Sequence, residues 1–122
     1  MGKIVLLDDQ PEICETLEYR LVEEGHEVRT ALTGEDAIDL GYLFEPDLLI
    51  TDWNLESDYD GYEVAEAITY ANGDVKTILI TGCLGTADSD FQFHAKIPKP
   101  FSYDELAAIV DRTLKTNKHK GL

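Results

Sequence analysis

The sequence predicts an α/β fold in which a mostly parallel, doubly wound sheet carries helices on both faces. Short apolar runs alternate with longer amphipathic stretches, as in successive β-α units. The run from Asp47 to Asp52 is apolar between its two acids, which is typical of a parallel strand buried on both faces. A length of 122 residues with 43% hydrophobic residues is enough for one domain with its own core.

The charge balance narrows the range of partners. A formal net charge of −15 repels nucleic acid phosphates and anionic lipids, and it favours basic partners or bound cations. No apolar run is long enough to span a membrane and no signal peptide precedes the first predicted strand, so we expect a cytoplasmic protein. The two cysteines, Cys14 and Cys83, are too few for a zinc set or a disulfide framework.

The first third of the chain predicts strand, helix and strand. A buried strand covers Lys3–Leu7, and Pro11 suits the first turn of the helix that follows because its missing N–H has no helical partner there. Gly25 is expected to end this helix. The shorter, charged run Glu27–Ala31 predicts an edge strand. The apolar stripe of the helix consists of Ile13, Leu17 and Leu21.

Two more helices flank the central strand. Thr33 is the predicted N-cap of the first, and Pro46 separates this helix from the strand that ends at Asp52. A polar, acidic loop follows, and Gly61 opens the second helix. The inward faces are predicted to be Ala37, Leu40 and Phe44 in the first helix, and Val64, Ile68 and Ala71 in the second.

The last third predicts two strands and a helix. The strands cover Val75–Thr81 and Ala95–Pro98, and the stretch Gly82–Asp90 between them predicts at most a short helix. Ser102 and Glu105 have the spacing of a capping box. The final helix packs through Leu106, Ile109, Val110 and Leu114.

Acidic side chains stand where the predicted strands end. Asp8 and Asp9 follow the first strand and Asp52 ends the third, so all three are expected to meet at the carboxyl edge of the sheet. Carboxylates held close together need a cation, and Mg²⁺ prefers oxygen ligands. A carboxylate can also accept a phosphoryl group, whose charge Lys99 and the Thr81 hydroxyl are placed to compensate. The pattern predicts a magnesium-dependent phosphoryl acceptor at Asp52.

In their order along the chain, these residues resemble the motifs of the receiver domains of two-component response regulators, the family of the chemotaxis regulator. No single motif is specific, but the ordered set is, and it covers nearly the whole chain. The matching segments are Leu7-Asp8-Asp9, Asp52, Asp60-Gly61, Thr81-Gly82 and Lys99-Pro100-Phe101.

The resemblance implies a flavodoxin-like, five-stranded parallel sheet in the order 2-1-3-4-5, with the receiver domain at 1–117 and a basic tail or linker stub at 118–122. By the same resemblance, Asp52 is the phosphoacceptor, and Thr81 and Lys99 contact the phosphoryl group. Asp8, Asp9, Asp52 and the backbone carbonyl of Asn54 are the expected Mg²⁺ ligands. The Lys99-Pro100 peptide bond is expected to be cis.

The resemblance also implies partners. The phosphoryl donor is a phosphohistidine on a histidine kinase or a histidine phosphotransfer protein, and phosphorylation alters binding to a downstream protein target. The chain is then a signalling domain rather than an enzyme, with no direct contact to nucleic acid or membrane.

Three features depart from the family pattern. Lys96 stands where the family usually has a tyrosine or phenylalanine whose rotamer follows phosphorylation. The stretch between Thr81 and Lys99 is short, and the loop from Asp52 to Gly61 is one residue longer than the family pattern and lacks the usual proline. These departures leave open a second interpretation, a receiver-shaped interaction module with altered or lost phospho-switching.

Other site types are weaker. The ligand positions of an EF-hand calcium loop match Asp52, Asn54, Glu56, Asp58, Asp60 and Glu63. However, Ser57 replaces the required glycine, and a strand rather than a helix is predicted directly before Asp52. A phosphatase acting through an aspartyl phosphate needs an acid two residues after the nucleophile, where this chain has Asn54. A flavin-binding relative needs a hydroxyl- and glycine-rich phosphate loop, which the acids after the first strand would oppose.

Overall fold

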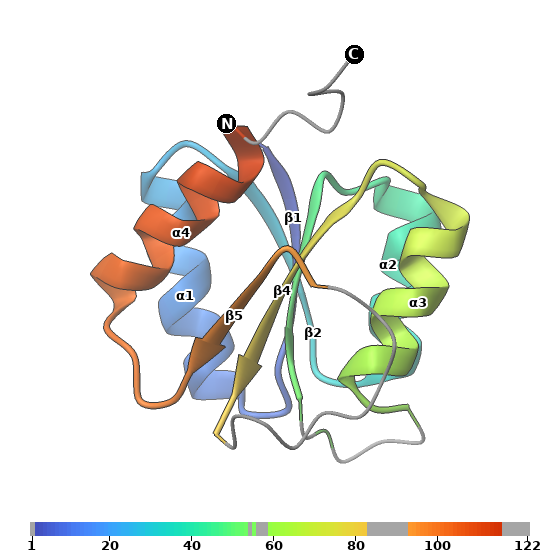
Figure 1. Cartoon of the computed structure of the whole chain (residues 1–122), viewed down its shortest axis with the longest axis horizontal. Helices are drawn as coiled ribbons and strands as arrows, with labels where there is room; N and C mark the ends of the chain where they lie inside the picture. The colour runs from blue at the N-terminus through green and yellow to red at the C-terminus, as the bar shows by residue number, and fades with distance from the viewer. Residues whose placement is uncertain (1, 54, 56–58, 83–92, 116–122) are drawn as a thin grey trace.

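We analysed a computed structural model, which describes residues 2–53, 55, 59–82 and 93–115. Within these ranges the chain forms a five-stranded parallel sheet in the order β2-β1-β3-β4-β5, with α1 and α4 on one face and α2 and α3 on the other (Figure 1). The predicted flavodoxin-like topology is therefore confirmed. The elements are β1 (Lys3–Leu7), α1 (Pro11–Glu23), β2 (Glu27–Ala31), α2 (Gly34–Phe44), β3 (Leu48–Asp52), α3 (Gly61–Ala71), β4 (Lys76–Thr81), β5 (Ala95–Pro98) and α4 (Tyr103–Lys115).

Local sequence signals set most of these bounds. Pro11 occupies the first turn of α1, and Gly25, just beyond its end, has a φ of +99°, a conformation that glycine adopts without strain. The Thr33 side chain accepts the N–H of Asp36 and caps α2. Ser102 and Glu105 form the predicted capping box before α4. The fourth strand begins at Lys76, one residue after the predicted start.

The core has two layers, one on each face of the sheet. Alternate residues of each strand point to opposite faces, so Ile4 and Leu6 belong to one layer while Val5 and Leu7 belong to the other. The first layer contains the buried side chains of α1 and α4, and the second those of α2 and α3. Burial on both faces explains why β1 and β3 are mostly apolar, whereas the edge strands β2 and β5 keep exposed charged residues.

The inward helix faces differ in detail from the predicted ones. Leu40, Phe44 and Ala71 are only half-buried, whereas Gly41 is buried. A Cβ at Gly41 would lie 2.8 Å from Cγ1 of Ile68, so glycine is what lets α2 and α3 approach each other here. None of the helices described is long and apolar enough to cross a membrane.

Candidate functional site

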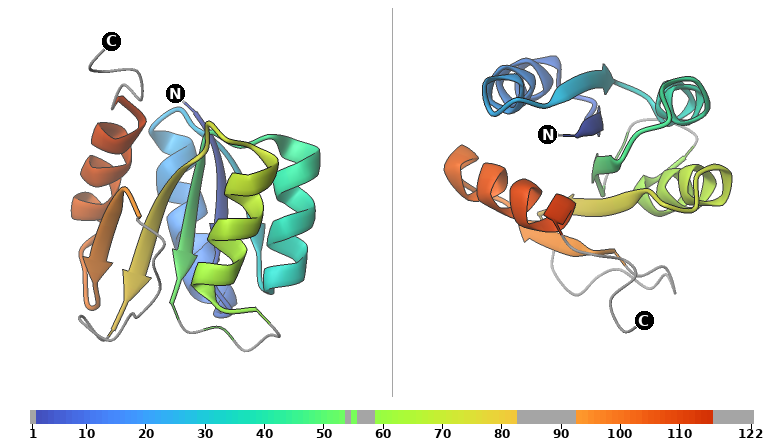
Figure 2. Two further views of the ribbon diagram at one scale, coloured as in Figure 1. Left: turned by 45° about the vertical axis from the view of Figure 1, so that its right-hand side comes forward. Right: turned by 90° about the horizontal axis from the view of Figure 1, so that it is seen from above.

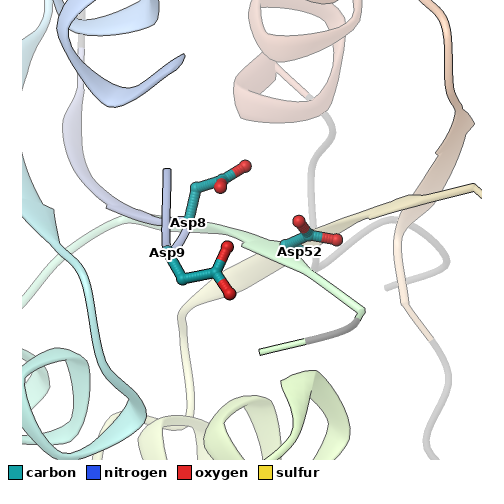
Figure 3. Close-up of side chains that lie close together, drawn as sticks. All are labelled: Asp8, Asp9 and Asp52. Carbon is teal, nitrogen blue, oxygen red and sulfur yellow. The ribbon is translucent and has the colours of Figure 1, made fainter. Parts of the chain in front are cut away.

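Three carboxylates meet at the carboxyl edge of the sheet. Asp8 and Asp9 follow β1, and Asp52 is the last residue of the neighbouring strand β3. Figure 3 shows the three side chains turned toward a common space, and one oxygen of each lies within 4.8 Å of the others. Asp8 is 2% exposed and Asp52 is 5% exposed. The structure thus brings together the acids that the sequence predicted would converge.

Asp8 is held by the backbone around it. Its Oδ1 accepts the N–H of Gln10 at 2.9 Å, which fixes one face of the carboxylate, and its own N–H donates to the Ala31 carbonyl of β2. The Cys14 thiol donates to the Asp8 carbonyl from α1, and burial, the largest cause, raises the pKa of this thiol to about 11. Cys14 is therefore a neutral support of the Asp8 backbone.

Burial raises the pKa of Asp8 above its ordinary value, because a charged carboxylate loses hydration inside the protein. The Gln10 N–H acts in the opposite direction, and the negative charge of Asp52 then raises the pKa further. Lys99 lowers it by a smaller effect. The side chains of the protein therefore compensate the negative charge of the acidic cluster only in part.

Among the described residues, Lys99 pairs with Asp52. Lys99 follows β5, which is separated from β3 by β4, and its Nζ lies 2.8 Å from Oδ2 of Asp52. The Lys99 N–H donates to the Thr81 carbonyl at 2.8 Å, which ties the end of β5 to that of β4. Thr81 is 4% exposed. The Lys99-Pro100 peptide bond is cis, as predicted.

The start of α3 packs directly against the backbone of Asp52. A Cβ at Gly61 would lie 2.5 Å from the Asp52 carbonyl oxygen, so only glycine fits there. Asp60 and Glu63 form a capping box that fixes this helix start. We did not predict this box, although its signal, an acid three residues before a glutamate at a helix start, was present in the sequence.

An aromatic cluster lies beside Asp52. The ring of Trp53 meets the buried ring of Tyr62 edge-on at 4.7 Å, and Tyr62 meets Phe93, just before β5, at 5.2 Å. The backbone N–H of Trp53 donates to the Ile80 carbonyl of β4 at 2.9 Å. Trp53 itself is half-buried. The three residues are distant in sequence, and no local pattern links them.

Of the other residues singled out in the sequence, the structure describes Lys96 but not Asn54, Cys83 or the tail. Lys96, at the position where receiver domains usually have an aromatic residue, is exposed on β5. Asn54, Cys83 and the stretch of possible short helix from 83 to 90 lie outside the described residues, as does the predicted tail at 118–122.

The calcium-loop interpretation finds no support in the elements around Asp52. The residues before Asp52 form strand β3, where an EF-hand requires a helix. Glu63, which would be the last calcium ligand, instead accepts the N–H of Asp60 within the capping box of α3.

The donor set fits a hard divalent cation. In the part of the chain that the structure describes, the three carboxylates lie beside one paired ammonium group, that of Lys99 on Asp52, which leaves two formal negative charges in a space where two of the acids are almost fully buried. Oxygen-only ligands of this kind suit Mg²⁺, which is bound through one or two carboxylates while it keeps several waters. The acidic cluster is therefore typical of a magnesium site.

A doubly wound sheet with a triad of aspartates and a lysine at its carboxyl edge defines a phosphoacceptor signalling domain rather than a conventional enzyme. The family comparison agrees with this class. Residues 4–111 match the response regulator receiver domain, and the chain belongs to that family. Receiver domains are phosphorylated by histidine kinases.

Curated relatives and solved structures are similar over most of the chain. The cell cycle response regulator CtrA of Brucella ovis is 30% identical over 120 residues, which cover 95% of this chain and 51% of that protein. The chain thus spans about half the length of the curated relatives it matches. The non-phosphorylated HemR receiver domain from Leptospira biflexa has a TM-score of 0.86 at 26% identity, covering 97% of this chain and 98% of that one.

One structural relative bears on the metal. The receiver domain of the sensor histidine kinase PA1611 from Pseudomonas aeruginosa has a magnesium ion coordinated in its active-site cleft. It matches this chain with a TM-score of 0.82 at 25% identity, covering 94% of this chain and 98% of that one.

Proposed function

We propose that this domain is a phosphorylation-dependent switch in which Asp52 accepts a phosphoryl group from a phosphohistidine. The donor is a histidine kinase or a histidine phosphotransfer protein in the cytoplasm, and the phosphorylated domain changes its binding to a downstream protein. The observation that carries the proposal is the position of Asp52, which lies in contact with Lys99 and within one cluster with Asp8 and Asp9.

In this proposal an Asp52 carboxylate oxygen attacks the phosphorus atom. A P–O bond forms, the P–N bond to the donor histidine breaks, and the imidazole leaves with the electron pair of that bond. Such a transfer depends mainly on positioning and on compensation of the phosphoryl oxygens' charge. Mg²⁺ would supply positive charge when held by Asp8, Asp9, Asp52 and the Asn54 carbonyl.

The residues of the chain have separate tasks in the transfer. Lys99, which already touches Asp52, would move onto a phosphoryl oxygen, and the Thr81 hydroxyl would donate to another. Asp8 and Asp9 would hold the cation. Gly61 and the capped start of α3 would hold the Asp52 backbone in place, which supports the geometry without contact to the reacting atoms.

A pocket next to Lys99 leaves the site open to a phosphoryl donor. It has a volume of about 490 Å³ and opens to solvent beside the site. Its lining consists of Ile13, Gly82, Lys99, Pro100, Phe101 and Tyr103.

The test is phosphorylation by a small-molecule donor. With acetyl phosphate and Mg²⁺, intact-mass analysis should show one added phosphoryl group, which alkali removes. The Asp52→Asn variant should gain none, whereas Asp47→Asn, the same substitution at the amino edge just before β3, should be modified like the parent. Modification of Asp52→Asn, or none of the parent protein, would refute the assignment.

A second candidate function is a receiver-shaped interaction module with altered or lost phospho-switching. The exposed Lys96 favours it, because this side chain cannot pack as an aromatic switch residue does. Complete switching needs about 5.5 kcal/mol of differential stabilisation. If the phosphorylated and unphosphorylated forms bind the downstream partner with equal affinity, this second function replaces the first.

A further inference from the structure

The last turns of α2 and α3 expose large side chains far from the acidic cluster. Leu43 is 83% exposed, Tyr42 is 63% exposed and Tyr70 is 92% exposed. The two helices lie side by side on one face of the sheet (Figure 2). Their last turns are joined, because the side-chain amide of Asn72 donates to the Gly41 carbonyl at 2.6 Å. The exposed side chains therefore stand on one continuous helical layer.

Neither α2 nor α3 carries a basic residue, although Lys3 of β1 and Arg29 of β2 lie over the Phe44 ring at the end of α2. Between Arg29 and Lys76 the sequence has no lysine, arginine or histidine, whereas aspartate and glutamate occur twelve times. On the described surface of α2 and α3 the exposed acids include Asp39 and Glu66. Both stand in the middle of their helices, so interaction with a helix N-terminus does not explain them.

Each of these two acids is a neighbour of an exposed large side chain. Leu43 follows Asp39 by four residues, and Tyr70 follows Glu66 by four, a spacing that places side chains next to each other on a helix surface. Both helices thus repeat the same unit, an acid one turn before an exposed hydrophobic side chain.

The opposite layer also has more acids than bases, but unlike α2 and α3 it carries basic residues of its own, Arg20 on α1 and Arg112 and Lys115 on α4. Arg20 of α1 pairs with Glu24 and with Asp104 of α4, and Lys115 pairs with Asp111. Among the described residues, no ion pair involves α2 or α3. The charge of the α2/α3 layer is therefore available to a group from outside the domain.

We propose that the α2/α3 layer docks a basic amphipathic segment of a partner protein. Lysine or arginine side chains of the segment would face Asp39 and Glu66, and apolar side chains one turn away would cover Leu43, Tyr42 and Tyr70. Complementary charge of this kind speeds association and fixes the register of the two partners. Nucleic acid and anionic lipid are excluded by their own negative charge.

The docking surface lies at the opposite end of its helices from the acidic cluster. Because α2 and α3 run back from the carboxyl edge, their last turns sit near the amino ends of the strands (Figure 1). Docking there is expected to be independent of phosphorylation, and the inference does not rest on the proposed function.

A helical peptide with lysine and leucine one turn apart serves as the probe. Its affinity, measured by fluorescence anisotropy, should fall about tenfold for the double variant Asp39→Lys/Glu66→Lys. The matched control is Glu15→Lys/Glu18→Lys on α1, which changes the net charge equally and lies near the exposed Tyr19. It should lose less than about threefold, because Arg20 already opposes docking there. Equal losses of affinity in the two double variants would show that the peptide responds only to the net charge of the domain, and would overturn the proposal.

Two further measurements separate the alternatives. Leu43→Ser/Tyr70→Ser keeps the charge and should also weaken the peptide about tenfold, because apolar anchors dominate such contacts; unchanged affinity contradicts the proposal. In the parent protein, amide chemical shifts should move in the last turns of α2 and α3, a readout that needs no variant to fold. Shifts confined to α1, or a dimer that forms without peptide and is abolished by Asp39→Lys, would overturn it. Asp52→Asn should bind the peptide normally.

Discussion

Charged and polar side chains have different partners at the amino edge of the sheet and at its carboxyl edge. At the amino edge, three of them are paired with the backbone. Asp47 accepts the Lys3 N–H at 2.9 Å, His26 Nδ1 accepts the Gly2 N–H at 3.1 Å, and the Lys76 ammonium donates to the Leu114 carbonyl at 3.3 Å. These contacts join β1 to the residue before β3, Gly2 to the residue before β2, and β4 to the end of α4.

At the carboxyl edge, acids are gathered with too little compensation. Asp8, Asp9 and Asp52 share one space, and Lys99 pairs with Asp52. Like charges at this distance oppose folding unless a cation binds. The amino edge of the sheet therefore contributes stability, and the carboxyl edge contributes reactivity. A group of acids that is destabilised in the fold can bind a cation and take part in chemistry.

The largest expected effect is the loss of stabilisation by Mg²⁺ in Asp8→Asn, a variant at the carboxyl edge. Without metal this variant should be at least as stable as the parent, because it removes a buried charge. At Mg²⁺ a hundredfold above Kd, the parent should gain about 2.7 kcal/mol of unfolding free energy, and the variant should lose most of that gain. Urea denaturation with and without Mg²⁺ measures both.

Asp47→Asn is the control for this prediction at the amino edge. It should leave the Mg²⁺ response unchanged, since Asp47 is paired with the Lys3 backbone at the other end of the sheet. If Asp8→Asn responds to Mg²⁺ as strongly as the parent, the cluster is not the metal site.

Gly61→Ala tests the packing behind Asp52. Because the new Cβ would lie 2.5 Å from the Asp52 carbonyl oxygen, the start of α3 must shift, at a cost of about 1–3 kcal/mol. Mg²⁺ affinity should fall with it, as the Asp52 backbone moves. Gly73→Ala is the matched control, because a Cβ there meets nothing within 4 Å. Equal stability of both variants in urea would contradict the close contact.

A smaller effect is the pH dependence of the two edges. Burial lowers the pKa of His26, as does the N-terminal ammonium, and burial and then Lys76 lower the pKa of His94. The unfolded chain then binds more protons than the folded one, so stability should fall as the pH drops below 6.5. In His94→Gln, whose amide oxygen can still accept the Thr77 N–H, this loss should shrink.

The carboxyl edge should show the opposite sign. The pKa of Asp8 is raised, so in metal-free protein the folded state binds the proton more readily and stability from this group increases as the pH falls toward 3.8. Thermal unfolding across pH in the presence of a chelator, compared between the parent and Asp8→Asn, separates the two contributions. If the parent and the variant have the same dependence of thermal stability on pH, the pKa of Asp8 is not raised in the folded state.

The smallest effect is optical. Trp53 follows Asp52 directly and packs on Tyr62, so its fluorescence should change when Mg²⁺ binds, and calcium should not outcompete Mg²⁺. Asp47→Asn should keep this response and Asp8→Asn should weaken it. Preference for calcium in the titration would instead support the rejected loop at 52–63.

The sequence by itself determined the elements and the acids at their ends. Apolar runs, Pro11, Thr33 and the Ser102 capping box act over a few residues, so their physics is readable from neighbours in the chain. The identity of Asp52 as the acid that ends a buried strand also followed from the pattern. The strand order 2-1-3-4-5 came from the resemblance to receiver domains rather than from local signals.

Only the tertiary structure decided which of these groups touch. Lys99 reaches Asp52 because β5 lies two strands from β3, a distance that depends on strand order and register and not on sequence spacing. The contact of Gly61 with the Asp52 carbonyl and the ring cluster of Trp53, Tyr62 and Phe93 likewise join segments far apart in the chain. Side-chain periodicity tells which face a residue occupies, but long-range packing determines what that face meets.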